Sequence, residues 1–352
     1  MQIDERKLNE FVGRAVSDLA AGYAGVMISL GRKLGLYKAL AHNGPLNSRE
    51  VANRAGCSER YVREWLNSQA AGGYVVYHPS SETYELTPEQ AKVLADEDSP
   101  YYIPPAWDVP SSMWFDEDKA IVAFRTGKGV PWGEHNERLY HGVAAFYNNA
   151  YRAQLVQNWL PALNGVVEKL QTGAKVADVG CGHGPSTVLM AEAFPNSFFH
   201  GFDTHEESVA AAREYARRAG VDDRVRFEVA GAKNYPADGY DLVTFFDCLH
   251  DMGDPVGAAR HARNALADDG SVMLVEPFAH DHVENNLNPV GRLYFAASTT
   301  LCLAHSLSED GGTALGAQAG EGRLATVFHQ AGFRHFRRAT ETPFNLVLEA
   351  RP

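Results

Sequence analysis

The chain has 352 residues, of which 45% are hydrophobic, so it is long enough for about two domains with packed cores. Its formal net charge of −12 argues against binding to nucleic acids or anionic membranes, which require basic patches. The four cysteines form no C-x-x-C pair, which indicates reduced thiols in a cytoplasmic protein. No apolar run reaches the ~18 residues of a membrane span, and the N-terminal residues show no secretory signal pattern, so no membrane partner is expected.

The first elements are predicted to be helices. Apolar side chains recur at helical spacing from Leu8 to Leu19, and an apolar stretch rich in small residues follows, so residues 3–42 are expected to be helical. Ser48 is predicted to cap a short helix that ends at Gly56. A serine side chain can accept a hydrogen bond at the start of a helix, and glycine readily adopts the left-handed conformation that often follows its end.

A second helix is predicted to begin after Ser58 and to run to about residue 71, and two short strand patterns follow at 74–77 and 83–86. This order of elements is typical of a winged helix, so residues 1–98 are predicted to form a helical winged-helix domain. The charges on its two helices are nearly balanced: Arg49, Arg54, Arg60 and Arg63 against Glu50, Glu59 and Glu64. Because such helices offer few phosphate contacts, DNA binding is disfavoured and a dimerisation domain is favoured.

Residues 99–170 contain an unusual density of aromatic side chains. Prolines break the first part into loops, and a helical pattern begins after Gly133. One interpretation is a packed connector between two domains, and the other is a lid over an apolar or aromatic small molecule. The two interpretations are compatible, because a linker placed over a ligand-binding domain serves both roles. We therefore predict linker or lid helices here.

The C-terminal domain is predicted over residues 171–352. Strand patterns occur at 175–180, 198–203, 224–230, 240–246, 271–277, 333–339 and 345–350. Helical patterns at 185–194, 206–219 and 255–267 alternate with the first five strands, which predicts an α/β fold with a doubly wound, Rossmann-like parallel sheet. A short link joins the last two strands, which are expected to form a terminal antiparallel hairpin. The long insertion at 278–320 is expected to line a substrate pocket.

The first strand pattern of this domain ends in three alternating glycines, Gly180, Gly182 and Gly184, and a helical pattern follows directly. Glycines permit a tight turn against a ligand, and the helix directs its first N–H groups toward that ligand. The second strand ends in Asp203, where nucleotide-binding sites place a carboxylate for ribose hydroxyls. The sequence therefore predicts a cofactor that contains adenosine. The dinucleotide pattern G-x-G-x-x-G is not matched, because Pro185 replaces its last glycine.

Other residues at the carboxyl ends of the strands are predicted to complete the cofactor site. They are Asp178, Cys181, Thr204, Gly231, Ala232, Lys233, Asp247 and Cys248. Asp178 lies within a predicted buried strand and therefore needs hydrogen-bond partners, which suits an organiser of the loop. His280 and His282 are metal-binding residue types, but they lie in a polar loop without a further ligand pair, so no metal site is predicted.

The pattern hydrophobic-Asp-hydrophobic-Gly-Cys-Gly-x-Gly at 177–184 resembles motif I of class I S-adenosylmethionine (SAM) methyltransferases. The run Asp-Cys-Leu-His-Asp-Met-Gly-Asp at 247–254 is similar to the His-Asp segment of plant-type small-molecule O-methyltransferases and of related actinobacterial proteins, which carry a winged-helix dimerisation domain. The resemblance implies SAM as cofactor, a homodimer paired through the N-terminal domain, and His250 as general base. Many relatives place an aspartate at the position of Ala232 to bind adenine. Here that contact is absent, made by the backbone or supplied elsewhere.

The implied reaction is methyl transfer to a hydroxyl of an apolar or aromatic small molecule, although N- or C-methylation is also open. A phenol or alcohol is a weak nucleophile until its proton leaves, and a histidine that titrates near neutral pH can remove it. Glu276, at the end of the fifth strand, is predicted to orient the imidazole of His250. The alternative function is a SAM-sensing winged-helix transcription regulator, and an NAD(P)-dependent oxidoreductase is disfavoured by Pro185.

Overall fold

The computed structural model describes residues 3–352, which divide into two compact units. The first comprises the chain up to Ser111 together with Tyr140–Asn149, and the second comprises Ser112–Leu139 and Ala150–Pro352. The segment predicted as linker or lid helices is therefore shared between the two units. Each unit has a hydrophobic core of its own. No described helix is both long enough and apolar enough to cross a lipid bilayer.

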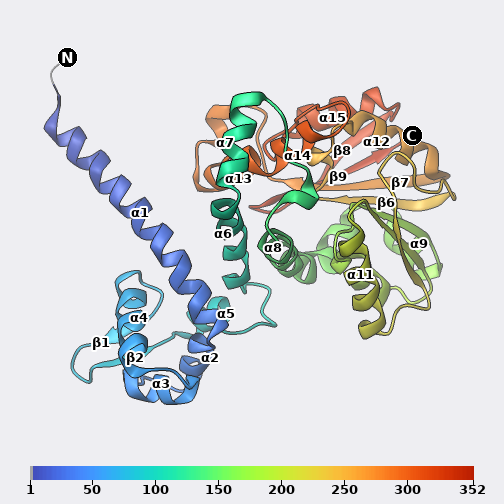
Figure 1. Cartoon of the computed structure of the whole chain (residues 1–352). Helices are drawn as coiled ribbons and strands as arrows, with labels where there is room; N and C mark the ends of the chain where they lie inside the picture. The colour runs from blue at the N-terminus through green and yellow to red at the C-terminus, as the bar shows by residue number, and fades with distance from the viewer. Residues whose placement is uncertain (1–2) are drawn as a thin grey trace. The chain divides into compact units, whose positions relative to one another are not determined.

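The first unit contains the predicted winged helix (Figure 1). Its elements up to residue 94 are α1 (Glu5–Lys33), α2 (Leu36–Leu40), α3 (Ser48–Ala55), α4 (Glu59–Ala71), β1 (Val76–His78), β2 (Thr83–Glu85) and α5 (Pro88–Leu94). Helices α3 and α4 pack against each other, and β1 and β2 pair antiparallel with Tyr77 opposite Tyr84. The predicted helices and hairpin are thus confirmed. The core of this unit includes the fully buried side chains of Ile28, Tyr37 and Leu66.

The start of α3 differs from the prediction by one residue. Asn47 is the N-cap, and its side chain accepts hydrogen bonds from the backbone N–H groups of Arg49 and Glu50. The carboxylate of Glu50 in turn accepts from the N–H of Asn47, which completes a capping box. Ser48 is already helical, and its hydroxyl donates to Glu59 at the start of α4. The predicted cap at Ser48 was wrong because the asparagine before it satisfies the first turn more completely.

The second unit is built on a seven-stranded sheet. Its strands are β3 (Lys175–Val179), β4 (Phe198–Asp203), β5 (Val225–Val229), β6 (Tyr240–Phe246), β7 (Leu266–Pro277), β8 (His335–Glu341) and β9 (Asn345–Arg351). They lie in the order β5-β4-β3-β6-β7-β9-β8. The first five are parallel, and β9 runs antiparallel to both β7 and β8. The predicted doubly wound sheet with a terminal hairpin is confirmed.

Helices cover both faces of this sheet, so its central strands are nearly continuous hydrophobic runs. Figure 1 shows α11 (Glu206–Ala219) on the opposite side of the sheet from α12 (Pro255–Ala265) and α15 (Glu321–Gln330). Other helices are α6 (Asp108–Phe115), α7 (Glu117–Thr126), α8 (Arg138–Gln154), α9 (Val166–Thr172), α10 (Pro185–Ala193), α13 (Pro289–Thr300) and α14 (Cys302–Ser308). Because crossovers from β3 and from β6 leave toward opposite faces, a crevice is expected between their carboxyl ends.

A short segment at 129–135 packs against the insertion that carries α14. The N–H of Val130 donates to the carbonyl of Ala304 at 2.8 Å, and the Trp132 ring lies 5.8 Å from the ring of His305. A Cβ atom on Gly129 would lie only 2.1 Å from backbone atoms of Ala304 and Ser308. The close approach of these two backbones therefore requires glycine at position 129.

We predict that Gly129→Ala destabilises the second unit by about 1–3 kcal/mol, because the added methyl group must push two backbones apart. The measurement is the midpoint of urea unfolding followed by near-ultraviolet circular dichroism. Gly133→Ala is the matched control, since a Cβ atom there would make only an ordinary contact of 3.7 Å with His205. Equal midpoints for the two variants would contradict the close packing at Gly129.

Candidate active site

The predicted glycine loop follows β3 and begins α10. Gly180, Gly182 and Gly184 all have positive φ, at 74°, 53° and 78°. A Cβ atom on Gly180 would lie 2.7 Å from the sulfur of Cys248, and one on Gly184 would lie 2.6 Å from the ring of Phe227. Both the backbone conformation and the available space therefore require glycine at these two positions. A Cβ atom on Gly182 would have no neighbour within 4 Å, which leaves its backbone open to a ligand.

Asp178 ties this loop to the centre of the sheet. The hydroxyls of Ser186 and Thr187, in the first turn of α10, donate to its Oδ2 atom at 2.7 and 2.6 Å. The hydroxyl of Thr244 on β6 donates to Oδ1 at 2.9 Å. Burial raises the pKa of Asp178, and the three hydroxyl donors oppose that rise. These contacts join β3, β6 and α10, which suits the predicted role of loop organiser.

Asp203 stands at the end of β4, beside the loop. Its Oδ2 atom accepts from the N–H of Gly182 at 2.9 Å, and its Oδ1 atom accepts from the N–H of His205 at 2.9 Å. The carboxylate is only half-buried and retains lone pairs for further donors such as ribose hydroxyls. A Cβ atom on Gly231 would lie 3.8 Å from the methyl group of Thr204, so the ends of β4 and β5 lie side by side.

The residues after β5 have polar and apolar partners within the chain. Lys233 is turned toward α12, where its ammonium group lies 3.2 Å from the carboxylate of the N-cap residue Asp254. Ala232 packs on the hydrophobic core, and the N–H of Gly231 donates to the side chain of Asn234 at 2.8 Å. Sequence reasoning overlooked Asn234, although asparagine is a common turn residue because its side chain bonds to nearby backbone groups.

The strand β6 ends in a strained turn at Asp247, whose φ is 51°. The buried carboxyl of Asp247 accepts hydrogen bonds from the hydroxyl of Tyr151 at 3.2 Å and from the amide of Asn345 at 3.1 Å. Burial raises its pKa well above the ordinary value. The thiol of the next residue, Cys248, donates to the carbonyl of Val179 at 3.2 Å and so lies against the glycine loop. Cys248 therefore borders the loop, whereas the Asp247 side chain turns toward β9.

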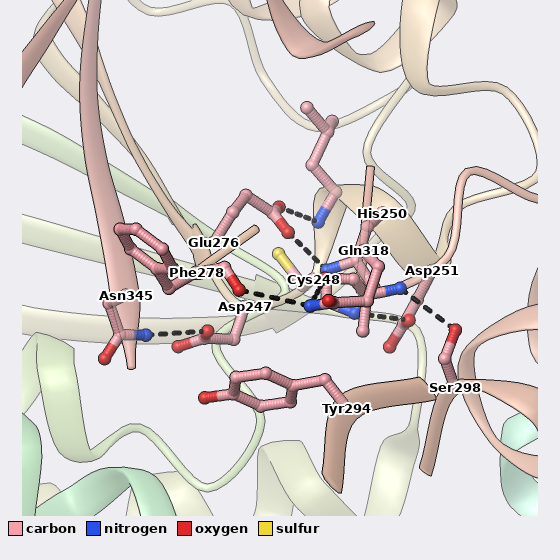
Figure 2. A network of polar contacts seen from close by, with 12 residues as sticks. Asp247, Cys248, His250, Asp251, Glu276, Phe278, Tyr294, Ser298, Gln318 and Asn345 are labelled. Carbon is pink, nitrogen blue, oxygen red and sulfur yellow. Dashed lines mark hydrogen bonds and ion pairs between the residues drawn. The ribbon is translucent and has the colours of Figure 1, made fainter. Parts of the chain in front are cut away.

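His250 is buried three residues further on, between two carboxylates (Figure 2). Its Nδ1 atom bonds to Oε2 of Glu276, and its Nε2 atom lies 2.9 Å from Oδ1 of Asp251. The second oxygen of Glu276 accepts from the N–H of Leu249 at 3.1 Å. Glu276, itself only 2% exposed, thus fixes both the imidazole and the backbone that carries it. The predicted neighbours His250 and Glu276 are in direct contact.

The electrostatic setting of His250 favours the imidazolium ion. Burial alone would lower its pKa, but the carboxylates of Asp251 and Glu276 outweigh this effect and raise the pKa well above the ordinary value. Burial alone would raise the pKa of Asp251, but the imidazolium of His250 outweighs this effect and lowers that pKa. Since the pKa of His250 is higher in the folded chain, this pairing stabilises the fold below pH ~6.5. That stabilisation is lost as the pH rises through the raised pKa.

Four polar residues of this site could not be identified from spacing alone. They are Tyr151, Tyr294, Cys302 and Asn345, of which Tyr294 and Asn345 are labelled in Figure 2. They come from α8, α13, α14 and β9, whereas Asp251 follows the histidine directly and was visible in the motif. Within the described range 3–352, His280 and His282 are not among the side chains grouped closely enough to share a metal ion.

Comparison with known proteins gives matches for two parts of the chain. Residues 22–96 match the Rv2258c-like winged HTH domain, and residues 170–332 match the methyltransferase domain. The 27-O-demethylrifamycin SV methyltransferase of Amycolatopsis mediterranei is 36% identical over 145 residues, which are 41% of this chain and 51% of that protein. The chain spans about half the length of the curated relatives it matches.

Solved structures resemble the whole chain. Human N-acetylserotonin methyltransferase in complex with SAM gives a TM-score of 0.71 at 18% identity over 97% of both chains. An O-methyltransferase family protein from Burkholderia thailandensis gives 0.69 at 16% identity over 100% of this chain and 99% of that one. The fold is therefore that of SAM-dependent methyltransferases. The chain carries a winged helix-turn-helix domain followed by a methyltransferase domain.

We predict that Asp251→Asn lowers the pKa of His250, because one of the two carboxylates that favour the imidazolium is removed while burial is retained. The measurement is an NMR titration of the chain with isotope-labelled histidine, in which the His250→Gln spectrum assigns the signal. Asp268→Asn, which neutralises an exposed carboxylate, is the control and should leave that titration unchanged. An unchanged His250 titration in Asp251→Asn would show that this carboxylate does not govern the charge of the imidazole.

Proposed function

We propose that this chain is a SAM-dependent methyltransferase that methylates a hydroxyl of an apolar or aromatic small molecule, with His250 as general base. The observation that carries the proposal is the position of His250 relative to the glycine loop. Cys248 contacts the carbonyl of Val179 and borders Gly180, and His250 follows only two residues later, held by Glu276. The candidate base is therefore attached to the edge of the candidate cofactor site by one short turn.

The residues of the loop suit a bound SAM. When bound, SAM supplies the methyl group and the leaving group of the reaction. Asp203 offers carboxylate oxygens to the ribose hydroxyls, and the open backbone at Gly182 lets the cofactor approach closely. Because Ala232 cannot accept a hydrogen bond through its side chain, we assign the adenine contacts to backbone groups around Gly231.

The protein's own part in the chemistry is to receive a proton and to hold the base in place. Nε2 of His250 would take the proton of the acceptor hydroxyl, and bound SAM would supply the methyl group for that oxygen. Glu276 keeps Nδ1 occupied, so Nε2 is the nitrogen that faces the acceptor. Asp251 competes for this nitrogen at 2.9 Å and favours its protonated form. The rate is therefore expected to rise with pH as His250 loses its proton.

We predict that His250→Ala lowers kcat by about 10²–10⁴-fold on a phenol panel, because the proton acceptor is removed. Glu276→Gln should lower kcat less and should shift the acid limb of the pH–rate profile to lower pH, since one carboxylate that raises the pKa of His250 is neutralised. A residue with only a structural role would not move that limb.

Calorimetric titration with S-adenosylhomocysteine accompanies these assays, and His250→Ala should bind it as tightly as the unmodified chain. His280→Ala, in the polar loop, is the control for activity. If His250→Ala retains full turnover while binding the cofactor product, the general-base assignment is wrong. If the unmodified chain fails to bind S-adenosylhomocysteine, the methyltransferase proposal itself fails.

The charge distribution of the winged helix favours a dimerisation role over DNA binding. On α4, Arg60 and Arg63 lie 2.6 and 3.0 Å from the carboxylates of Glu64 and Glu59. Arginines that are already paired with carboxylates release fewer counterions from a phosphate backbone. This pairing supports the enzyme proposal over the transcription regulator.

We further propose that a second copy of the chain covers α1. Exposed apolar side chains on this helix recur in alternating steps of four and three residues, a spacing typical of a helical seam that pairs with its own copy: Val12, Val16, Leu19, Tyr23, Val26 and Leu30. With Leu8 and Phe11, also exposed, they form an apolar surface that a chain rarely leaves in water. A homodimer paired through the first unit would bury it.

We predict that Val16→Asp weakens dimerisation by at least ~100-fold, because it would bury an unpaired carboxylate in the seam. Ser17→Asp adds the same charge to an adjacent exposed position outside the seam and should leave the dimer intact. Light scattering after size exclusion at several protein concentrations measures both variants. A monomeric unmodified chain, or a dimeric Val16→Asp, would contradict the proposed seam.

A further inference from the structure

We propose that His250, Asp251 and Cys302 form a binding site for a borderline-soft divalent cation such as Zn²⁺. One donor atom from each of these side chains lies within 4.8 Å of the other two. His250 and Asp251 come from the turn after β6, whereas Cys302 begins α14 in the insertion. The fold thus brings together donors that are far apart in sequence, which explains why spacing predicted no metal site.

The donor types and their separations fit a small tetrahedral ion. Zinc binds thiolate sulfur, imidazole nitrogen and carboxylate oxygen at about 2.0–2.3 Å, so its donors lie roughly 3.3–3.8 Å apart. Nε2 of His250 and Oδ1 of Asp251 are now 2.9 Å apart and would need to open by less than ~1 Å. A cation bound by the three donors would displace two protons to solvent, one from between Nε2 of His250 and Asp251 and one from the thiol of Cys302.

The second nitrogen of His250 supplies an independent argument. Metal-bound histidines generally donate their other ring N–H to a carboxylate, which fixes the tautomer and the ring orientation. Here Glu276 holds Nδ1, and Nε2 is the atom left facing Asp251 and Cys302. Glu276 is anchored in turn by the backbone N–H of Leu249. The outer contact that a histidine ligand needs is therefore already built.

The carboxylate of Asp251 is a further observation that supports a cation site. Its Oδ1 atom is shielded from solvent and makes no well-aligned hydrogen bond, although it lies at ion-pair distance from the imidazole. A buried carboxylate oxygen without an aligned donor is costly, and a cation in this position would satisfy it. The imidazole of His250 and the thiol of Cys302 are also buried, since these residues are 2% and 8% exposed. Within the described chain the group consists of these three donors, which leaves a fourth position for water or another oxygen.

This site does not depend on the proposed function, because cation binding and methyl transfer are measured separately. Where both hold, a bound cation occupies the lone pair of Nε2 that the base needs, so the cation is expected to inhibit methyl transfer. The His250 side chain would then serve either as base or as ligand, but not as both at once.

The test is a titration of the full, tag-free chain with Co²⁺, a spectroscopic probe of zinc sites, after treatment with EDTA. A bound thiolate gives a near-ultraviolet charge-transfer band, and tetrahedral Co²⁺ absorbs strongly in the visible range. We expect one equivalent to bind, both signals to appear, and Zn²⁺ to abolish them by displacement. Cys302→Ser should lose the charge-transfer band, whereas Cys57→Ser, in the first unit, should retain it.

Glu276→Gln should weaken cation binding by about 10–100-fold, because it removes the contact that orients His250. Circular dichroism and a thermal unfolding midpoint confirm that each variant is folded. An unchanged band in folded Cys302→Ser, or no cation bound by the unmodified chain, overturns the site. If the cation fails to bind while His250→Ala still loses methyl transfer, the metal site falls and the proposed function stands. If the cation binds but the unmodified, cation-free chain transfers no methyl group, the metal site stands and the proposed function falls.

Discussion

The cofactor edge of this molecule depends on a single buried carboxylate, Asp178. Its hydroxyl partners lie on α10 and β6, so one side chain fixes the distance between the first helix turn and the two central strands. These strands are the pair at which the winding of the sheet reverses, and any ligand crevice must open there. The hydroxyl donors favour the charged form of Asp178 against the cost of burial, and without them the loop would have no rigid support.

A second group of buried ionisable side chains follows the neighbouring strand β6, and its carboxylates compete for one imidazole. Asp178 has neutral hydroxyl partners, but His250 has two carboxylate partners of competing geometry. Glu276 binds Nδ1 of the imidazole, and Asp251 lies beside Nε2. Nε2 is the nitrogen to which we assign the proposed proton transfer and cation binding. The two carboxylates raise the pKa of His250 and so favour its charged form. The cluster therefore holds a proton more tightly than a lone histidine would.

Local sequence patterns were sufficient to predict the sheet and to place the candidate site residues along its edge. The glycine loop, Asp203 and the His250 segment each lie in a contiguous motif whose backbone requirements can be read from residue type. Helix ends that depend on several side chains were harder to predict, as the start of α3 shows. Asn47 is the N-cap in place of Ser48 because Glu50 lies three residues after Asn47 and completes a capping box. The ion pair of Lys233 with Asp254, the N-cap residue of α12, was likewise not visible in the local sequence.

Contacts made by distant segments were beyond local patterns. Tyr151, Asn345 and Cys302 reach the site from α8, β9 and α14, and nothing in their immediate sequence marks them as polar partners of the β6 turn. Their positions follow from the packing of the insertion and of the terminal hairpin, which only the folded chain defines. The same holds for Gly129, whose requirement arises from a backbone on another helix.

The left-handed backbone of Asp247 has a consequence for how this chain can change over time. Non-glycine residues in this conformation cost of order 1–3 kcal/mol, although aspartate tolerates it better than most. Substituting glycine would relieve that cost and simultaneously empty a buried carboxyl position between Tyr151 and Asn345. The hydroxyl of Tyr151 and the amide of Asn345 would then lose their acceptor, which is costly for buried donors. A glycine here would therefore exchange backbone strain for unpaired polar groups, and the strained aspartate is retained by its partners rather than by its own conformation.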